Sequence, residues 1–175
     1  LFLYIIMYMQ KYSILALLFS IYSSNLFANP ACFSSNDKLG DSAYWSITAI
    51  ELFAQKKYED AVAVVDLCFD IWGPEAKKIQ KEMHDDKVPA PAVGKVSPEQ
   101  KKAIQKNYQM NDVSMALWTK AVSLDRLGLD INAKVAYVEC INMTHGRIWD
   151  SGGYEPNGWF WSPAEDCAKK VKKLI

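Results

Sequence analysis

Histidine is scarce in this chain of 175 residues, which contains only two, His84 and His145. Most histidine-based catalytic triads and histidine-rich metal sites therefore lack their essential side chains. The sequence also lacks the GxSxG, HExxH, P-loop and dinucleotide-binding motifs. Neither sign of charge is in excess, since 20 Lys and Arg balance 20 Asp and Glu, and this balance excludes nucleic-acid binding through a broad basic face. We expect no metal, no cofactor and no nucleic-acid partner.

Charge is almost absent from residues 1–28, which hold 21 apolar side chains and one charged side chain, Lys11. After Lys11 an apolar run extends to Tyr22, and the segment ends on the small residue Ala28. A short positive start, an apolar core and a small terminal residue are typical of a secretory signal peptide. We therefore predict a signal peptide over residues 1–28, with cleavage after Ala28, and a periplasmic or secreted protein.

The apolar segment allows a second interpretation. Residues 1–22 approach the roughly 20 residues that a membrane-spanning helix needs, so the alternative is a membrane-anchored protein that keeps this segment. Met7 or Met9 is the expected translation start, which leaves residues 1–8 largely untranslated. After the signal peptide we predict an N-terminal extension over 29–41 and one helical domain over 42–175.

Cysteine pairs of the CxxC type are absent, so neither a thioredoxin-like redox site nor a zinc ribbon is indicated. The chain has four widely spaced cysteines instead: Cys32, Cys68, Cys140 and Cys167. An even number of cysteines in an exported protein predicts disulfides. Four cysteines allow three pairings, and spacing alone does not choose among them.

Two segments, residues 42–75 and 114–147, have the apolar spacing of paired helices. In the first segment we predict helices over 42–56 and 58–72, the second of which ends at Gly73-Pro74. An offset of 72 residues superposes the two segments. The offset matches Trp45 with Leu117, Ala49 with Ala121, Leu52 with Leu124, Ala61 with Ala133, Val65 with Tyr137 and Cys68 with Cys140.

Both segments resemble tetratricopeptide repeats, which are 34-residue helical hairpins. The resemblance lies in small residues where the two helices of a hairpin cross: Ala49 and Ala61 in the first segment, Ala121 and Ala133 in the second. Val65 departs from the pattern, because the family usually has an aromatic residue there. The resemblance implies an all-α fold in which helical hairpins stack into a superhelix.

The segments between and after the hairpins are also predicted from the sequence. We expect a charged helix over residues 74–86 and a proline-rich linker over residues 87–97. The residues Ser97-Pro98-Glu99-Gln100 predict the capped start of a helix that extends to about Asn107. Asn111-Asp112 is the predicted cap of the second hairpin. In the tail, 148–175, we expect an irregular aromatic-rich loop and then a C-terminal helix from 163 to 174.

The resemblance also implies a groove lined by the first helix of each hairpin. Its expected ligand-binding residues are Ser46, Ile50, Phe53, Trp118, Val122, Asp125 and Arg126. The family's carboxylate clamp uses Lys and Asn at such positions, and this set is missing, so a chain-terminal carboxylate is not the expected ligand. We therefore expect a non-catalytic scaffold or adaptor that binds a protein or peptide in the bacterial envelope.

The hairpins also bear on the disulfides. Equivalent positions in stacked repeats lie too far apart for the 4.4–6.8 Å Cα separation that a disulfide requires. This argues against pairing Cys68 with Cys140. We predict instead that Cys32 pairs with Cys68 and Cys140 with Cys167, each bond joining a terminal segment to the second helix of the nearer hairpin.

Residues 149–161 contain three of the six tryptophans. Their rings either cover the open end of the last repeat, which we favour, or bind a glycan such as peptidoglycan through Tyr154, Trp159 and Trp161. A third hypothesis is a small hydrolase that uses an acidic pair, Asp150 with Glu155 or Glu165 with Asp166. The two Glu165-Asp166 carboxylates have a simpler explanation, because acidic residues are favoured in the first turn of a helix.

Overall fold

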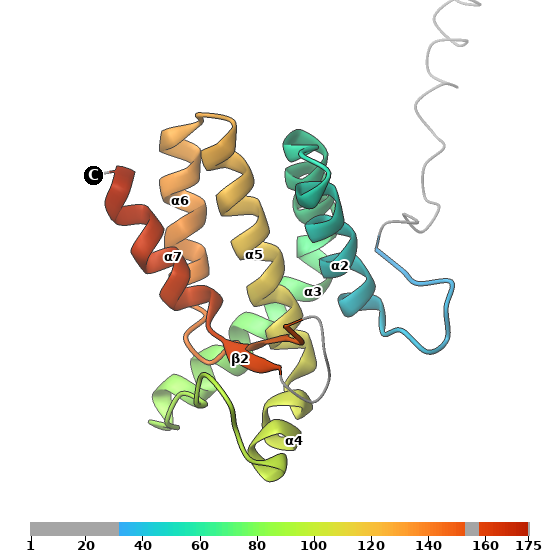
Figure 1. Cartoon of the computed structure of the whole chain (residues 1–175), viewed down its shortest axis with the longest axis vertical. Coiled ribbons are helices and arrows are strands. Elements are labelled where there is room, and N and C mark those ends of the chain that lie inside the picture. The colour runs from blue at the N-terminus through green and yellow to red at the C-terminus, as the bar shows by residue number, and fades with distance from the viewer. Residues whose placement is uncertain (1–31, 153–157, 175) are drawn as a thin grey trace, which may run out of the picture.

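The computed structural model describes residues 32–152 and 158–174, which form six α-helices and one small antiparallel sheet (Figure 1). The expected signal peptide lies outside the described residues. The elements are α2 (Asp41–Ala54), α3 (Tyr58–Asp85), α4 (Pro98–Lys106), α5 (Tyr108–Arg126), α6 (Asp130–Ile141), β1 (Ile148–Asp150), β2 (Trp159–Trp161), α7 (Pro163–Val171) and the 3-10 turn η1 (Lys172–Leu174). The predicted all-α class is confirmed. Within the described residues no helix has both the length and the hydrophobicity needed to cross a membrane.

The helices form two antiparallel hairpins, α2–α3 and α5–α6, with α5 at the centre of the molecule. α5 packs against α2 and α3 on one side and against α6 and α7 on the other, and Figure 1 shows α2, α5, α6 and α7 in a row with α3 behind them. The core lies along α5 and includes the fully buried Trp45, Leu117 and Tyr137. Trp45 is held by a hydrogen bond of 2.9 Å from its Nε1 to the carbonyl oxygen of Val64.

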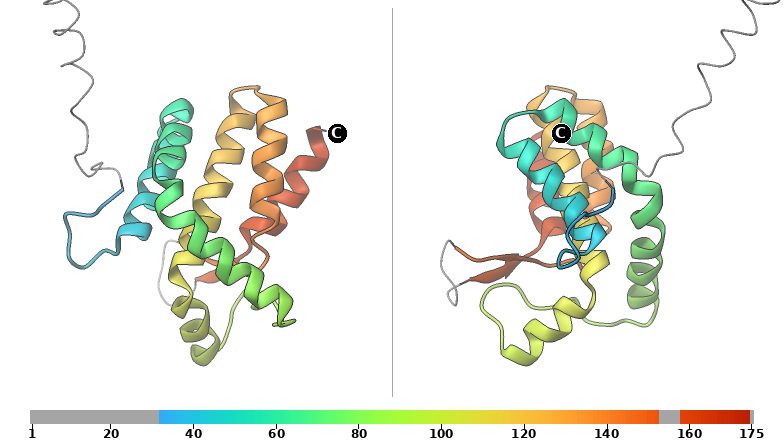
Figure 2. Two further views of the ribbon diagram at one scale, coloured as in Figure 1. Left: turned by 180° about the vertical axis from the view of Figure 1, so that it is seen from behind. Right: turned by 90° about the vertical axis from the view of Figure 1, so that its right-hand side faces the viewer.

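One helix, α3, is longer than the sequence predicted. Gly73-Pro74 was expected to end it, but α3 continues without interruption to Asp85, and Figure 2 shows that it bends midway. Proline removes one helical hydrogen bond and commonly kinks a helix rather than ending it. Gly73 fits because the Phe69 ring lies where a side chain would be. The helix continues because its second half packs against neighbouring elements, so that its residue Ala76 is fully buried.

The start of the second hairpin also differs from the prediction. Asn111-Asp112 is not a helix cap, because α5 begins earlier, at Tyr108, directly after the Asn107 residue that ends α4. The predicted start of α4 is confirmed. Ser97 Oγ accepts a hydrogen bond from the Gln100 backbone N–H, and the Gln100 side chain accepts one from the Ser97 N–H, which is a complete capping box.

The tail is more ordered than the predicted irregular loop. β1 and β2 pair antiparallel, with Trp149 opposite Phe160, and Phe160 forms a further bridge with Gly94 in the 87–97 linker. Apolar and aromatic side chains favour extended pairing when a neighbouring surface buries one face. The C-terminal helix is confirmed as α7, which Ser162 caps by accepting a hydrogen bond from the Glu165 N–H at 3.3 Å.

Both predicted disulfides are present. Cys32 is bonded to Cys68 with a Cα separation of 5.5 Å, and Cys140 to Cys167 with 6.2 Å. The first bond attaches the segment before α2 to helix α3, and the second attaches helix α7 to helix α6. Two disulfides are typical of proteins in an oxidising, exported environment.

Candidate functional site

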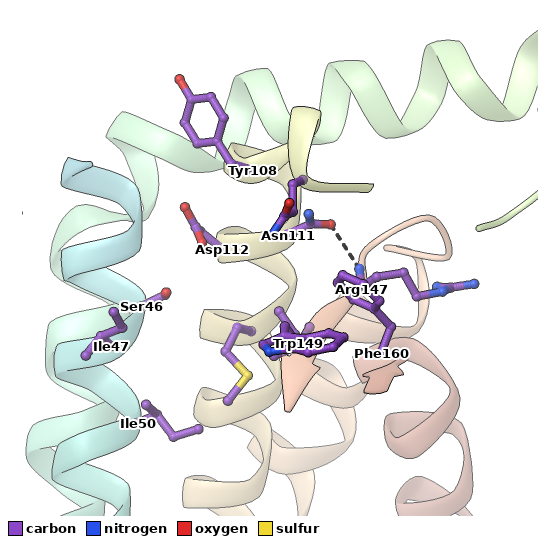
Figure 3. A pocket seen from close by; sticks show the side chains of 12 residues that line it. Ser46, Ile47, Ile50, Tyr108, Asn111, Asp112, Arg147, Trp149 and Phe160 are labelled. Atoms are coloured by element: carbon purple, nitrogen blue, oxygen red, sulfur yellow. Dashed lines mark hydrogen bonds between the residues drawn. The ribbon is translucent and has the colours of Figure 1, made fainter. Parts of the chain in front are cut away.

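A cleft opens between α2, α5 and the β1–β2 hairpin, with a volume of about 490 Å³ (Figure 3). Most of its surface is apolar or aromatic, as is common in ligand-binding clefts. Twelve residues line it: Ser46, Ile47, Ile50, Gln105, Tyr108, Asn111, Asp112, Met115, Arg147, Ile148, Trp149 and Phe160. We regard this cleft as the candidate binding site.

One wall of the cleft belongs to α2. Ser42, Trp45, Ser46 and Ala49 are buried at helical spacing and fix the orientation of α2 on the core. That orientation turns the neighbouring Ile47 toward the cleft, where it remains 40% exposed. An exposed branched apolar side chain beside a cleft supplies contact area for a ligand.

The β1–β2 hairpin supplies the opposite, aromatic wall. Trp149 contacts Phe160 edge to face, with ring centroids 4.9 Å apart, and Phe160 is buried. Gly158 is required here because the Trp149 indole occupies the space that a side chain at 158 would take. The Lys101 ammonium lies 3.9 Å from the centre of a Trp149 ring, a cation–π contact that further fixes the indole. The hairpin therefore presents an aromatic surface to the cleft.

Asp112 is the only carboxylate among the lining residues. It lies one helical turn after Tyr108, and Ser42 Oγ donates to its Oδ2 at 2.7 Å. Burial raises the pKa of Asp112 to about 6, and the Ser42 hydrogen bond opposes this increase only in part. A partly desolvated carboxylate in an apolar cleft is a strong determinant of which ligand charge can enter.

A buried polar network holds the hairpin and the linker in place. Asn111 accepts a hydrogen bond from the Arg147 backbone N–H through Oδ1 at 2.9 Å and donates to the Ile104 carbonyl at 2.9 Å. The Arg147 Nε donates to the Pro91 carbonyl at 2.8 Å, and burial lowers the pKa of Arg147. Because Asn111 bridges α4 and the start of β1, its role is to connect these elements and not to cap a helix.

A second part of the network connects α3 to the same region. Gln80 donates to His145 Nδ1 at 2.8 Å and accepts from the His145 backbone N–H at 2.9 Å. The Nε2 of His145 lies 2.8 Å from the Val88 carbonyl oxygen. His145 is therefore a buried structural residue that joins the second half of α3 to the linker.

Only two of the predicted groove residues lie in the cleft, and the others lie elsewhere on α2 and α5. Ser46 and Ile50 line the cleft. Phe53 and Trp118 contact each other edge to face, with centroids 5.7 Å apart, beyond the lining of the cleft. Three more lie along the second half of α5: Val122 is buried, Asp125 accepts a hydrogen bond from the Tyr137 hydroxyl at 2.8 Å, and Arg126 is exposed.

The aromatic residues of the tail mostly pack against the helices. Trp161 lies against Trp118 with centroids 5.5 Å apart, whereas Trp159 is 40% exposed. Tyr154 lies outside the described residues, as does Glu155. Both Trp149 and Trp161 are only half-buried, so the hairpin covers part of the helical surface and also keeps aromatic area accessible.

The acidic residues considered for hydrolysis have structural contacts. Asp166 accepts a hydrogen bond from Trp118 Nε1 at 2.6 Å and lies 3.6 Å from the Lys170 ammonium. Glu165 lies in the first turn of α7. The Asp150 carboxylate accepts the Gly152 N–H at 2.8 Å.

Sequence reasoning missed several residues of the cleft, including Ile47, Tyr108, Asp112 and Trp149. Asp112 was assigned to a helix cap, and Trp149 was counted with the aromatic tail but not among the binding residues. Nothing local signals that Ser42 meets Asp112, since 70 residues separate them.

No protein-family model, no curated protein and no solved structure matches this chain.

Proposed function

We propose that this protein is an exported, non-catalytic scaffold or adaptor of the bacterial envelope that binds a segment of another polypeptide in the cleft between α2, α5 and the β1–β2 hairpin. The observation that carries the proposal is the cleft itself. Exposed Ile47 faces it from one side and the half-buried Trp149 from the other. Concave apolar surfaces with a few polar groups are the usual form of binding sites for peptide side chains.

We further propose that the two hairpins are arranged as in tetratricopeptide repeats, and the packing of the helices supports this. The first helix of the second hairpin, α5, packs against both helices of the first, and α7 follows on the open side of α6, as a closing helix does in a stack of helical repeats. The four small residues at the helix crossings, Ala49, Ala61, Ala121 and Ala133, are all fully buried. Small residues at such positions allow the two helices of a hairpin to approach closely.

Site-specific photocrosslinking tests the proposal. A photoreactive benzoylphenylalanine at Ile47 lies in the cleft, and one at Val138, which is 53% exposed on α6, lies outside it. We expect protein adducts from position 47 in envelope preparations, no equivalent adducts from position 138, and loss of the position-47 adducts on Trp149→Ala. Equal labelling from both positions, or position-47 adducts that persist in Trp149→Ala, would contradict binding in this cleft.

Glycan binding remains the second candidate, because the exposed Trp159 ring is available for stacking on a sugar. The two candidates differ in the tryptophan they need. Retention on insoluble peptidoglycan that is lost in Trp159→Ala but unaffected by Trp149→Ala would favour the glycan. Crosslinking to protein that is unaffected by Trp159→Ala would favour the polypeptide.

A further inference from the structure

The cleft presents a single charged group to a ligand. Of its two charged lining residues, Arg147 directs its side chain away from the cleft (Figure 3). The Arg147 guanidinium donates to the carbonyl oxygens of Pro91, Thr144 and Gly146, so its hydrogen bonds are made within the protein. Asp112 therefore gives the cleft its negative charge.

The Asp112 carboxylate has only part of the hydrogen bonding that it can accept. Ser42 donates to Oδ2, while Oδ1 has no hydrogen-bond partner among the described residues. Within that same part of the chain no cation forms an ion pair with Asp112, whereas Asp66 pairs with Lys120 at 2.6 Å. A carboxylate that is largely removed from water gains strongly from an arriving cation, because its desolvation has already occurred on folding.

The surroundings of Asp112 suit the stem and head of a basic side chain. Tyr108 lies one turn before Asp112 on α5 and is 61% exposed, so its ring is accessible to a cation. Ile47 and Ile50 lie across the cleft on α2 and offer an apolar surface for a methylene stem (Figure 3). Lysine and arginine side chains combine such a stem with a charged head.

We propose that the cleft selects a lysine or arginine side chain of the bound polypeptide, with Asp112 as the counter-ion of its charged head and the α2 isoleucines in contact with its stem. This inference rests on the proposed function, since it names the chemistry of the ligand for the same cleft. It also predicts that acidic segments are rejected, because they would place a second negative charge beside Asp112.

Peptide pools with one fixed position test this selection. The probes are acetylated and amidated hexapeptides with mixed apolar residues around a central Arg, Lys, citrulline or Glu, and the readout is retention on the immobilised full chain. Citrulline has nearly the shape of arginine without its charge. We expect the Arg and Lys pools to bind about tenfold more tightly than the citrulline pool, with the Glu pool weakest, because charge-assisted hydrogen bonds are roughly twice as strong as neutral ones.

Two substitutions of the same kind separate the role of Asp112 from a general effect of charge. Asp112→Asn keeps an oxygen that accepts the Ser42 hydrogen bond, so the fold is retained while the negative charge is lost. Asp70→Asn changes the net charge equally at an exposed position on α3 outside the cleft. We expect Asp112→Asn to bring the Arg and citrulline pools to within about twofold of each other and Asp70→Asn to leave the tenfold preference intact.

The outcomes distinguish this inference from the proposed function. Binding that is lost in both Trp149→Ala and the milder Ile47→Gln, but shows no preference for a basic residue, keeps the cleft as the site and overturns the selection of a cation. A preference for Arg and Lys that survives Asp112→Asn also overturns it. No retention of any pool by the wild-type chain contradicts peptide binding itself, and the inference fails with it.

Discussion

The two helical hairpins share an apolar pattern but are buried to different extents. α5 buries twelve of its nineteen residues, whereas α2 buries four of fourteen, because α5 has helices on both sides and α2 lies at the end of the row. The unburied side of α2 is the side that forms a wall of the cleft. A helix at the end of a stack thus keeps apolar residues available for a ligand, which a central helix cannot do.

Equivalent serines illustrate the same difference. Ser42 and Ser114 are related by the 72-residue offset, and both are buried. Ser114 Oγ donates to the Met110 carbonyl one turn earlier on its own helix at 2.8 Å. Ser42, at the start of α2, donates across to Asp112 on α5 instead. The same residue therefore has a local partner in the central helix and a long-range partner beside the cleft.

The largest expected effect comes from the matched core residues Trp45 and Leu117. Despite the greater exposure of α2, both side chains are almost completely buried, so both hairpins should depend on them. We expect Trp45→Ala to lower the free energy of unfolding by about 3–5 kcal/mol and Leu117→Ala by about 2–5 kcal/mol. Urea denaturation measures both. A loss below about 1 kcal/mol for Trp45→Ala would show that α2 contributes little to the core.

The two disulfides compare the hairpins a second time. The two cysteines of the first disulfide are 36 residues apart in the sequence and those of the second are 27 apart. Chain-entropy reasoning therefore predicts that removal of either disulfide lowers the free energy of unfolding by about 3–4 kcal/mol. The variants are Cys32→Ser with Cys68→Ser, and Cys140→Ser with Cys167→Ser, measured by thermal and urea unfolding. Losses that differ severalfold would indicate that one hairpin stays folded without its disulfide.

The pH dependence of stability tests the burial of Asp112. Its pKa rises from 3.8 to about 6 on folding, so the folded state holds the proton more tightly than the unfolded state. The ionised group is therefore destabilising above pH 6, and this cost declines as the pH falls from 6 to 4. The shift corresponds to about 3 kcal/mol at most.

Asp112→Asn measures this cost directly. We expect the variant to be more stable than the wild type at pH 8, by up to about 3 kcal/mol, and equal to it well below the ordinary pKa of 3.8, where Asp112 is protonated in both states. Asp70→Asn is the matched control and should show no such gain. A constant difference between Asp112→Asn and the wild type across this pH range would contradict a buried, titrating carboxylate.

The smallest effect concerns one hydroxyl that distinguishes the hairpins. Tyr137 and Val65 occupy equivalent positions, and both are fully buried, but only Tyr137 donates a hydrogen bond, to Asp125. Burial raises the pKa of the Tyr137 hydroxyl, which stays protonated as a donor. We expect Tyr137→Phe to cost about 1 kcal/mol in urea unfolding, with more if Asp125 loses its orientation. A neutral result would mean that water replaces the hydroxyl.

Local sequence signals predicted the helical hairpins, the capping box at Ser97 and the C-terminal helix, whereas the choice of disulfide pairs came from the resemblance to stacked repeats. The helices and their caps depend on residues that are close together in the sequence. The disulfide choice depends on the distance between equivalent positions of the two hairpins. The prediction was wrong at Pro74, because a helix continues through a proline when later residues are well packed. The predicted helix cap at Asn111 was also wrong. The Asn111 side chain accepts a hydrogen bond from the backbone N–H of Arg147, which lies 36 residues away in the sequence and gives no local signal.

Helix periodicity and capping are encoded within a few residues, and for this reason the helices and their pairing into hairpins could be predicted before the structure was known. The even number of cysteines likewise predicted disulfides. The set of side chains that forms the cleft depends instead on tertiary packing. Ile47, Asp112 and Trp149 come from three separate elements, and their meeting depends on how α2 and the β1–β2 hairpin pack against α5. Burial, which raises the pKa of Asp112, is likewise a property of the packed molecule, because only neighbouring elements remove water from a carboxylate.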